Sequence, residues 1–306
     1  MGTAKIILTG LDNAGKTSLL IALEKKFAYE EDLKNLKPTQ RVNRDQFTFL
    51  NQKIIRWDFG GQGKYREEYL GNKERFFNDI DLFFFVVDIQ DRERYMESVE
   101  YFEEILKFIA EKQMKIPVIV LFNKSDPGLR GKPATEKALI SLKDMFLKAK
   151  GDYFVDFFET SIFSIDTVMV AFSQAFARYL PRTELISNLF EEFATAHPCL
   201  AILLLDASGI TIADYYRQQI TPEERAFIRE MRTLGLKRLM GEKNDKESIK
   251  SQLPWGTTIF GEISKFPVRD TKLGLLIFSE KEQTLKEDIQ KYLPRVEEIL
   301  KGILKE

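Results

Sequence analysis

The sequence predicts an α/β fold followed by a smaller α+β region, and two observations carry this prediction. In residues 1–181 apolar strand patterns alternate with helical patterns, which is typical of a mostly parallel sheet with helices on both faces. After residue 181 the order becomes helix, strand pair, long helix, strands and helix, which favours a largely antiparallel sheet. We therefore expect one domain over 1–181 and a second over 182–306.

The elements of the first region follow from hydrophobic patterning. Residues 4–9 and 82–87 are the apolar runs expected of strands covered on both faces. Phe47 and Phe49 alternate with polar residues, as in one arm of a hairpin. The six expected strands lie at 4–9, around 47–49, and at 53–57, 82–87, 118–122 and 153–158. Helices are expected over 16–28, 92–112, 134–149 and 165–180.

The second region begins at a proline. Pro181 ends the preceding helix because it lacks an N–H and clashes with the previous turn. Thr183 is then expected to cap a new helix. The polar stretch 242–250 is expected to be a mobile loop. The expected helices are 184–196, 222–241 and 282–304, and the expected strands are 199–206, 210–216, 256–263 and 273–279.

Composition excludes several functions. The chain has 46 Lys and Arg against 47 Asp and Glu, so it offers no field to gather nucleic acid or an anionic membrane. It has no apolar run of the length needed to span a bilayer, so direct membrane insertion is not expected. The lone Cys199 excludes an internal disulfide and indicates a reducing, cytoplasmic location. The lone His197 excludes multi-histidine metal sites and argues against Ser-His-Asp catalysis.

A glycine-rich segment lies between the first strand and the first helix. Gly10-Leu-Asp-Asn-Ala-Gly-Lys-Thr17 fits the pattern G-x-x-x-x-G-K-[ST]. Such a loop turns backbone N–H groups around a phosphate, and the following helix adds its positive N-terminal dipole. Lys16 is expected to reach the β- and γ-phosphates and to act in catalysis, and Thr17 to bind Mg²⁺. The nucleotide contacts predicted here are Asp12, Asn13, Ala14, Gly15, Lys16, Thr17 and Ser18.

A second motif, Trp57-Asp-Phe-Gly-Gly-Gln62, follows the third strand. Asp58 is expected to hold a water on Mg²⁺, and Gly61 to offer its N–H to a γ-phosphate. Gln62 is the predicted catalytic residue that orients an attacking water, in the way GTPases use a glutamine. Thr39 is expected to close on Mg²⁺ and the γ-phosphate; the alternative is an ordinary loop threonine.

Two further motifs predict guanine recognition. Asn123-Lys124-Ser-Asp126 ends the strand 118–122. The carboxylate of Asp126 would accept two hydrogen bonds from guanine, and adenine offers no such donor pair. After strand 153–158, Ser161 and the backbone of Ile162 are expected to contact the base.

These segments, in this order, resemble the Ras superfamily of small GTPases. The glycine-rich loop and the Trp-Asp-Phe-Gly-Gly-Gln segment are similar to the Arf branch. The whole chain looks more like the Rag/Gtr GTPases, in which a roadblock domain follows the GTPase domain. Glu74-Arg-Phe-Phe-Asn-Asp-Ile-Asp, Thr160-Ser-Ile162 and Leu203-Leu-Leu-Asp-Ala-Ser-Gly-Ile carry that likeness. Two departures are the Asp12-Asn13 pair, which Rag loops usually lack, and Phe163, where Ras-like proteins have a lysine.

The resemblance implies a Mg²⁺-dependent switch that binds GTP and GDP and hydrolyses GTP. Residues 182–306 would form a roadblock-like domain that dimerises, with a second copy or with a related Rag-like GTPase. GTPases with an arginine finger in cis place it three residues before the switch threonine, where this chain has Leu36. Intrinsic hydrolysis is therefore expected to be roughly 10³–10⁵-fold below an assisted rate. An activating protein would supply the arginine; Arg41 and Arg44 become cis candidates only if the protein alone is fast.

Three alternatives stay open at the level of sequence. One is a scaffold that holds nucleotide with negligible hydrolysis, against which Lys16, Thr17 and Gln62 argue. Another is an Arf-like trafficking GTPase with an appended interaction domain. A P-loop ATPase is the third, and Asp126 argues against it. In each case the near-neutral charge predicts that any peripheral membrane location comes through a partner.

Overall fold

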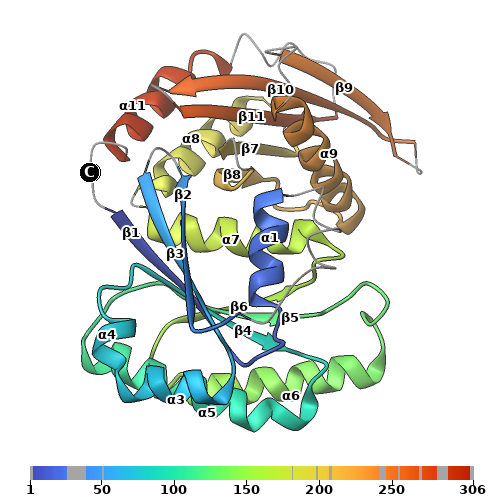
Figure 1. Cartoon of the computed structure of the whole chain (residues 1–306). Coiled ribbons are helices and arrows are strands. Elements are labelled where there is room, and N and C mark those ends of the chain that lie inside the picture. The colour runs from blue at the N-terminus through green and yellow to red at the C-terminus, as the bar shows by residue number, and fades with distance from the viewer. Residues whose placement is uncertain are drawn as a thin grey trace. The chain divides into compact units, whose positions relative to one another are not determined.

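The computed structural model divides the chain into two compact units, each with one sheet (Figure 1). One unit is formed chiefly by Gly2–Thr48 and Lys53–Ala175, and the other chiefly by Phe176–Glu306. The domain boundary expected near residue 181 stays a prediction, since Pro181 lies outside the described residues. The residues that the structure describes are 3–25, 39–49, 52–180, 182–197, 199–206, 209–240, 246–253, 256–268, 271–280 and 289–303.

The first sheet has six strands, as predicted. They are β1 (Thr3–Thr9), β2 (Val42–Phe49), β3 (Gln52–Phe59), β4 (Leu82–Asp88), β5 (Val118–Asn123) and β6 (Val155–Thr160). Their order in the sheet is β2-β3-β1-β4-β5-β6. From β3 to β6 every neighbouring pair is parallel. Parallel strands bring their carboxyl ends to one edge, so the motifs that follow β1, β3, β5 and β6 gather there.

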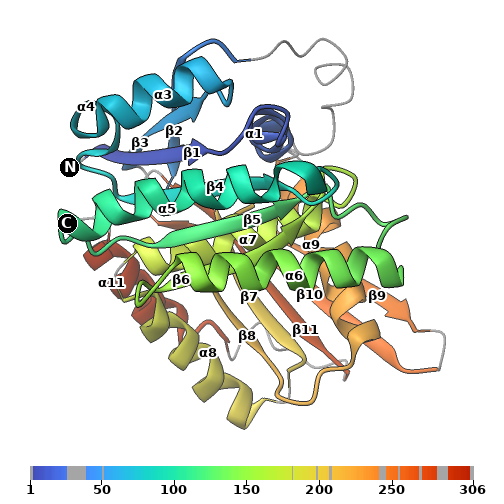
Figure 2. The same ribbon diagram turned by 90° about the horizontal axis from the view of Figure 1, so that it is seen from below.

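Helices cover both faces of this sheet, which confirms the predicted architecture (Figures 1 and 2). On one face, α5 (Tyr95–Glu111) and α6 (Pro133–Ala149) lie side by side (Figure 2). Phe85 of β4 meets Phe102 of α5, with ring centroids 5.2 Å apart. Its neighbour Phe84 stacks at 4.5 Å on Phe172 of α7 (Ile165–Tyr179) on the other face. Successive strand residues point to opposite faces, so β4 needs large apolar residues at consecutive positions.

Short helices complete the first unit. The helix α1 (Lys16–Lys25) follows β1, and a 3₁₀ turn, η1 (Arg92–Arg94), leads into α5. After β3 come α3 (Gly63–Gly71) and α4 (Lys73–Phe77), which the sequence patterns did not indicate. An aromatic cluster anchors both: the ring of Phe59 lies 4.7 Å from that of Tyr69 and 5.4 Å from that of Phe77, and all three are fully buried. This cluster fixes the chain on both sides of the turn at residues 60–62.

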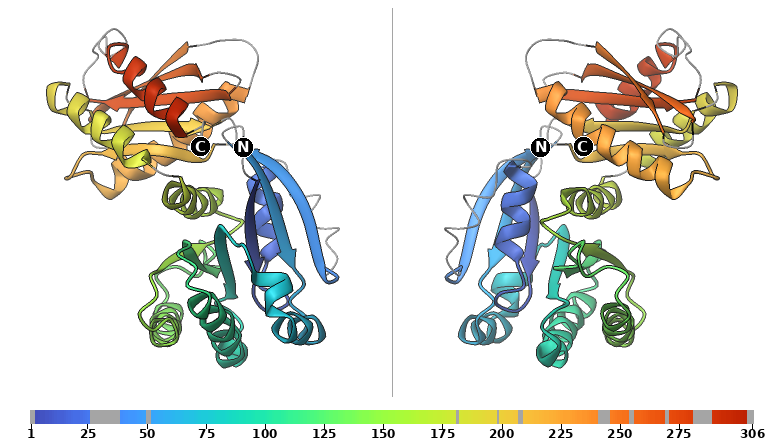
Figure 3. Two further views of the ribbon diagram at one scale, coloured as in Figure 1. Left: turned by 90° about the vertical axis from the view of Figure 1, so that its left-hand side faces the viewer. Right: turned by 90° about the vertical axis from the view of Figure 1, so that its right-hand side faces the viewer.

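The second sheet has five strands, mostly as predicted: β7 (Ala201–Asp206), β8 (Thr211–Tyr216), β9 (Lys246–Gln252), β10 (Thr258–Val268) and β11 (Thr271–Ser279). Their order is β8-β7-β11-β10-β9, and every neighbouring pair is antiparallel. Figure 3 shows the accompanying helices, which are α8 (Thr183–Ala196), α9 (Pro222–Met240) and α11 (Leu293–Ile303). Ile228 of α9 packs with Leu203, Ile263 and Leu276 in the core of this unit.

Three local predictions in the second region are wrong. Most of the expected loop 242–250 belongs to β9, which pairs with β10 from Lys246 to Gln252. Thr183 does not cap α8; it is the first helical residue, its hydroxyl donates to the carbonyl of Ala177 at 3.1 Å, and Arg182 precedes it with a φ of 66°. The last helix is not continuous from 282, because turns occupy 290–292 and α11 begins at Leu293.

In the part of the chain that the structure describes, the helices are too short or too polar to cross a bilayer.

Candidate functional site

The glycine-rich loop is held close to the ends of two other strands. Gly10 has a φ of 140°, and a Cβ there would lie 2.1 Å from the carbonyl oxygen of Val86 in β4. Gly15 has a φ of 89°, and its Cβ would lie 2.4 Å from the amide nitrogen Nδ2 of Asn123. Both positions therefore require glycine, for backbone angle and for space. The loop leads directly into α1, and the first N–H groups of a helix have no acceptor within it.

Lys16 is buried at the floor of this loop, with 5% of its surface exposed. Its ammonium Nζ donates to the carbonyl oxygens of Gly10 at 3.1 Å and Leu11 at 2.7 Å. Burial lowers the pKa of Lys16 to about 8, against the opposing charges of Asp58 and Asp12. The loop thus fixes a cation next to the start of α1, a combination suited to phosphate oxygens.

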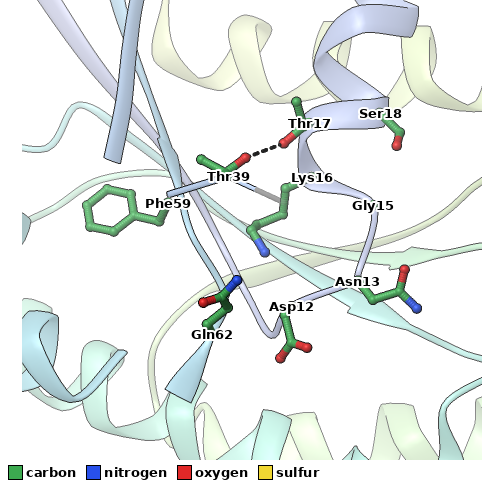
Figure 4. Close-up of a pocket in the computed structure, with 10 residues that line it drawn as sticks. Asp12, Asn13, Gly15, Lys16, Thr17, Ser18, Thr39, Phe59 and Gln62 are labelled. Carbon is green, nitrogen blue, oxygen red and sulfur yellow. Dashed lines mark hydrogen bonds between the residues drawn. The ribbon is translucent and has the colours of Figure 1, made fainter. Parts of the chain in front are cut away.

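The three predicted metal ligands come together next to Lys16. The hydroxyls of Thr17 and Thr39 are 2.8 Å apart (Figure 4), and they donate to Oδ2 of Asp58 at 2.6 and 3.3 Å. The other carboxylate oxygen, Oδ1 of Asp58, is buried and has no partner among the described residues. Burial raises the pKa of Asp58, although the hydrogen bond from Thr17 and the charge of Lys16 oppose the rise. Hard oxygen donors and an unsatisfied buried carboxylate fit a Mg²⁺ ion.

The turn after β3 packs directly on the loop. The carbonyl oxygen of Gly61 accepts the backbone N–H of Asp12 at 3.0 Å, and a Cβ on Gly61 would lie 2.1 Å from that nitrogen. Gln62 occupies the N-cap position of α3 without a capping hydrogen bond from its side chain, and this half-buried side chain extends toward Lys16 (Figure 4). Together these segments enclose a pocket of about 290 Å³. Its walls are Asp12, Asn13, Gly15, Lys16, Thr17, Ser18, Thr39, Phe59, Gly61 and Gln62.

Asn123 ties the loop to the ends of β5 and β6. Its buried amide Nδ2 donates to the carbonyl oxygen of Ala14 at 2.8 Å. Its oxygen Oδ1 accepts the hydroxyl of Thr160 at 3.1 Å. Asn123 therefore supports the loop through both ends of its amide. Its predicted contact with the nucleotide stays a prediction.

The other base-recognition residues gather beside Asp126, outside the walls of the pocket. The carboxylate of Asp126 accepts the hydroxyl of Ser161 at 2.6 Å and the amide Nε2 of Gln90 at 3.2 Å. Lys124 pairs with Asp88 at 2.6 Å. Sequence reasoning missed Gln90; its position just after the carboxyl end of β4, at the edge where ligands of parallel sheets bind, was the available signal.

The turn that carries Ser161 also presents two apolar residues. Ile162 is half-buried, and the side chain of Phe163 is 72% exposed. The backbone N–H of Phe163 donates to the hydroxyl of Ser161 at 3.1 Å, which orients that hydroxyl toward Asp126. The predicted contacts of Ser161 and Ile162 with a base stay predictions.

The cis-arginine candidates from the sequence lie elsewhere. Arg44 stacks on the ring of Trp57, with its guanidinium 3.8 Å from the ring centre. Arg41 is exposed, and its carbonyl accepts the N–H of Gly60 at 2.6 Å. Neither residue lines the pocket. Leu36 lies outside the described residues.

Two known proteins are similar to part of this chain. ADP-ribosylation factor-like protein 3 of Chlamydomonas reinhardtii is 38% identical over 130 residues, which cover 41% of this chain and 64% of that protein. The Caenorhabditis elegans protein of the same name is 35% identical over 123 residues, covering 40% and 61%. The chain thus spans less than two thirds of the length of these relatives.

A solved structure and a family model were also matched. The structure of the Arl6 BBS3 small GTPase from Trypanosoma brucei with bound GppNp aligns at 21% identity and a TM-score of 0.47, covering 58% of this chain and 98% of that one. The family model of the Gtr1/RagA G protein conserved region matches residues 5–231, which include every predicted site residue and most of the chain. The chain therefore belongs to the Gtr1/RagA family of G proteins.

Proposed function

We propose that the protein is a molecular switch that binds GTP and GDP with Mg²⁺ and hydrolyses GTP to GDP and phosphate. The observation that carries the proposal is the convergence of Thr17, Thr39 and Asp58 beside the glycine-rich loop, with Oδ1 of Asp58 left unpartnered among the described residues. A Mg²⁺ ion held by these residues would neutralise phosphate charge. The two threonines come from separate segments, so binding there would join them.

Guanine selectivity is assigned to Asp126. Ser161 and Gln90 each donate to one of its two oxygens, and the remaining lone pairs of the carboxylate could accept a pair of donors from one base. An adenine base lacks that donor pair and would leave the carboxylate unsatisfied, a penalty that typically gives strong discrimination. A competition between GTP and ATP for the purified protein separates this proposal from a P-loop ATPase.

Hydrolysis is assigned to Gln62, which would orient an attacking water, with Lys16 stabilising charge on the transferred phosphoryl group. The residues that line the pocket include no arginine. We therefore expect intrinsic turnover far below about 1 s⁻¹, and faster turnover with an activating protein that supplies an arginine.

The experiment has two parts. The first identifies the nucleotide retained by the purified protein, by chromatography after denaturation. The second measures single-turnover hydrolysis of GTP by wild type and by Gln62→Leu, with Arg92→Ala, which is outside the phosphate pocket and donates to the carbonyl of Ala134, as the control. Retained guanine nucleotide and hydrolysis that Gln62→Leu abolishes would support the switch. Retained nucleotide with no hydrolysis in wild type, even over hours, would support the alternative of a nucleotide-holding scaffold.

For residues 182–306 we propose a roadblock-like association domain that forms a homodimer, or a heterodimer with a related Rag-like GTPase. Family membership and the five-stranded antiparallel sheet support this proposal. Light scattering after size exclusion tests the homodimer, and a strict monomer at tens of micromolar would exclude it. An Arf-like trafficking role, which the names of the two curated relatives suggest, is the second candidate. A cytoplasmic protein that reaches membranes only through a partner fits either role.

A further inference from the structure

A cluster of four charged side chains joins the wall of the phosphate pocket to the turn after β3. Asp12 lines the pocket, and its Oδ1 accepts Nη2 of Arg94 at 2.7 Å. The Nε of Arg94 donates to Glu97 at 2.8 Å. Glu97 pairs closely with Arg66, whose Nε donates to the carbonyl oxygen of Gly61 at 2.9 Å. Two cations and two carboxylates thus alternate from the loop to Gly61.

Arg94 is the central member of this cluster. It lies in the 3₁₀ turn before α5, 82 positions from Asp12, so the pair is a tertiary contact. Its side chain is 29% exposed, and a third carboxylate, Asp91, lies 3.8 Å from Nη1. The hydrogen bonds that Arg94 donates to Glu97 and Asp12 raise its pKa, so Arg94 is charged at any working pH. Isolated ion pairs at a protein surface contribute little to stability. The position of this cluster beside the phosphate pocket therefore suggests a role other than stabilising the fold.

The role follows from where the Asp12 carboxylate lies. Burial alone would raise the pKa of Asp12, but the hydrogen bond and charge of Arg94 lower it, so the group is ionised at neutral pH. A full negative charge on the wall of a phosphate pocket repels a polyphosphate. The repulsion grows with the ligand's charge, and a triphosphate carries more negative charge than a diphosphate. Without a counter-charge, Asp12 would disfavour GTP relative to GDP.

We propose that Arg94 is a specificity-determining residue that neutralises Asp12 and thereby sets the relative affinity for GTP over GDP. This inference rests on the proposed function and assigns the residue that tunes it. Arg94 acts through Asp12, so it is a positioning and charge-balancing residue and not a catalytic one. Arg94 also contacts Glu97, which pairs with Arg66, and Arg66 holds the carbonyl of Gly61 in place on the loop.

The test is an equilibrium titration of the full chain, freed of nucleotide, with fluorescent GDP and with a fluorescent hydrolysis-resistant GTP analogue, both with Mg²⁺. Arg94→Ala is expected to weaken the binding of the triphosphate about three- to tenfold more than the binding of the diphosphate. Asp12→Asn, which removes the negative charge and leaves the cation, is expected to shift the ratio in the opposite direction. The double variant Asp12→Asn/Arg94→Ala should return close to the wild-type ratio.

Two controls separate charge balance from folding. Arg92→Ala removes an arginine in the same turn, which donates to the carbonyl of Ala134 at 2.8 Å, and should leave the ratio unchanged. Arg94→Lys keeps the positive charge and should bring the ratio of triphosphate to diphosphate affinity part of the way back to the wild-type value. A merely structural role would weaken both nucleotides equally and would give Asp12→Asn the same sign as Arg94→Ala; either result overturns the inference. A wild-type protein that binds neither nucleotide would refute the proposed function itself, whereas normal binding with an unchanged ratio would refute only this inference.

Discussion

Replacing Asn123 with alanine should loosen the glycine-rich loop by an amount that the structure allows us to estimate. The substitution removes the hydrogen bonds to the carbonyl of Ala14 and from the hydroxyl of Thr160, at 2.8 and 3.1 Å. All three residues are buried, so the carbonyl of Ala14 would lose the donor that Asn123 provides and the hydroxyl of Thr160 would lose its acceptor. A buried polar group that loses its partner costs about 1–3 kcal/mol, and two groups lose theirs, so the free energy of unfolding should fall by about 2–6 kcal/mol.

The assay is urea unfolding followed by the fluorescence of Trp57, which lies in β3 of the same unit. The chain has two tryptophans, so Trp255→Phe provides a background in which the signal reports this unit. Thr160→Val is the matched comparison, because it removes only one of the two hydrogen bonds, and about half the loss is expected.

A double-mutant cycle then isolates the bond between the two side chains. Asn123→Ala and Thr160→Val remove the same hydrogen bond, so their effects should be less than additive by about 1 kcal/mol. Strict additivity, or a loss below about 0.5 kcal/mol for Asn123→Ala, would refute the view that Asn123 supports the loop.

Three further predictions concern the phosphate pocket. Asp58→Asn should not destabilise the protein in metal-free buffer, because burial raises the pKa of Asp58. With Mg²⁺ and nucleotide at 100 times Kd, the free energy of unfolding of the wild type should rise by about 2.7 kcal/mol. The substitution should abolish this rise, which thermal unfolding measures. Burial lowers the pKa of Lys16 to about 8, so the unfolded chain binds more protons above that pH and nucleotide-free stability should rise between about pH 8 and 10.5. Lys16→Met should remove the contribution of Lys16 to this rise, up to about 3 kcal/mol. The contribution of Lys5, whose pKa burial also lowers to about 8, should remain. A stability profile against pH that is the same as that of the wild type would contradict the lowered pKa of Lys16. Gly61→Ala, whose Cβ would lie 2.1 Å from the nitrogen of Asp12, should displace the turn and slow single-turnover hydrolysis at least about tenfold, whereas an unchanged rate would show that the turn is not needed where it packs.

The sequence predicted the site best where spacing and strand order constrain it. Residues at the carboxyl ends of parallel strands must meet at one edge of the sheet, so the sequence alone places Asp58 and Asp126 at that edge. The Arg94–Asp12 pair could not, because 82 positions separate the two residues and neither belongs to a periodic pattern that indicates the contact. For Thr39 the sequence offered only its position, and the structure adds the 2.8 Å contact with Thr17.

The fold was predicted where apolar residues dominate and missed where they do not. The strand β9, Lys-Glu-Ser-Ile-Lys-Ser-Gln, has one large apolar residue and lies at the edge of its sheet, where charged residues are common. Hydrophobic patterning cannot distinguish such a strand from a loop. Pro294 signals the break before α11, since proline suits the first helical turn, but the helical pattern on either side concealed it.

The two donors that hold Asp126 have a consequence for how tightly a base can bind. Ser161 and Gln90 each donate one hydrogen bond to a different oxygen of this carboxylate, which can accept about four in all. The two donors therefore hold the carboxylate in place and leave it room for a pair of donors from one base. A base with that pair has little to order on binding, whereas a base without it gains nothing at this position. Base recognition at this edge would therefore depend on an acceptor that is already positioned before the base binds.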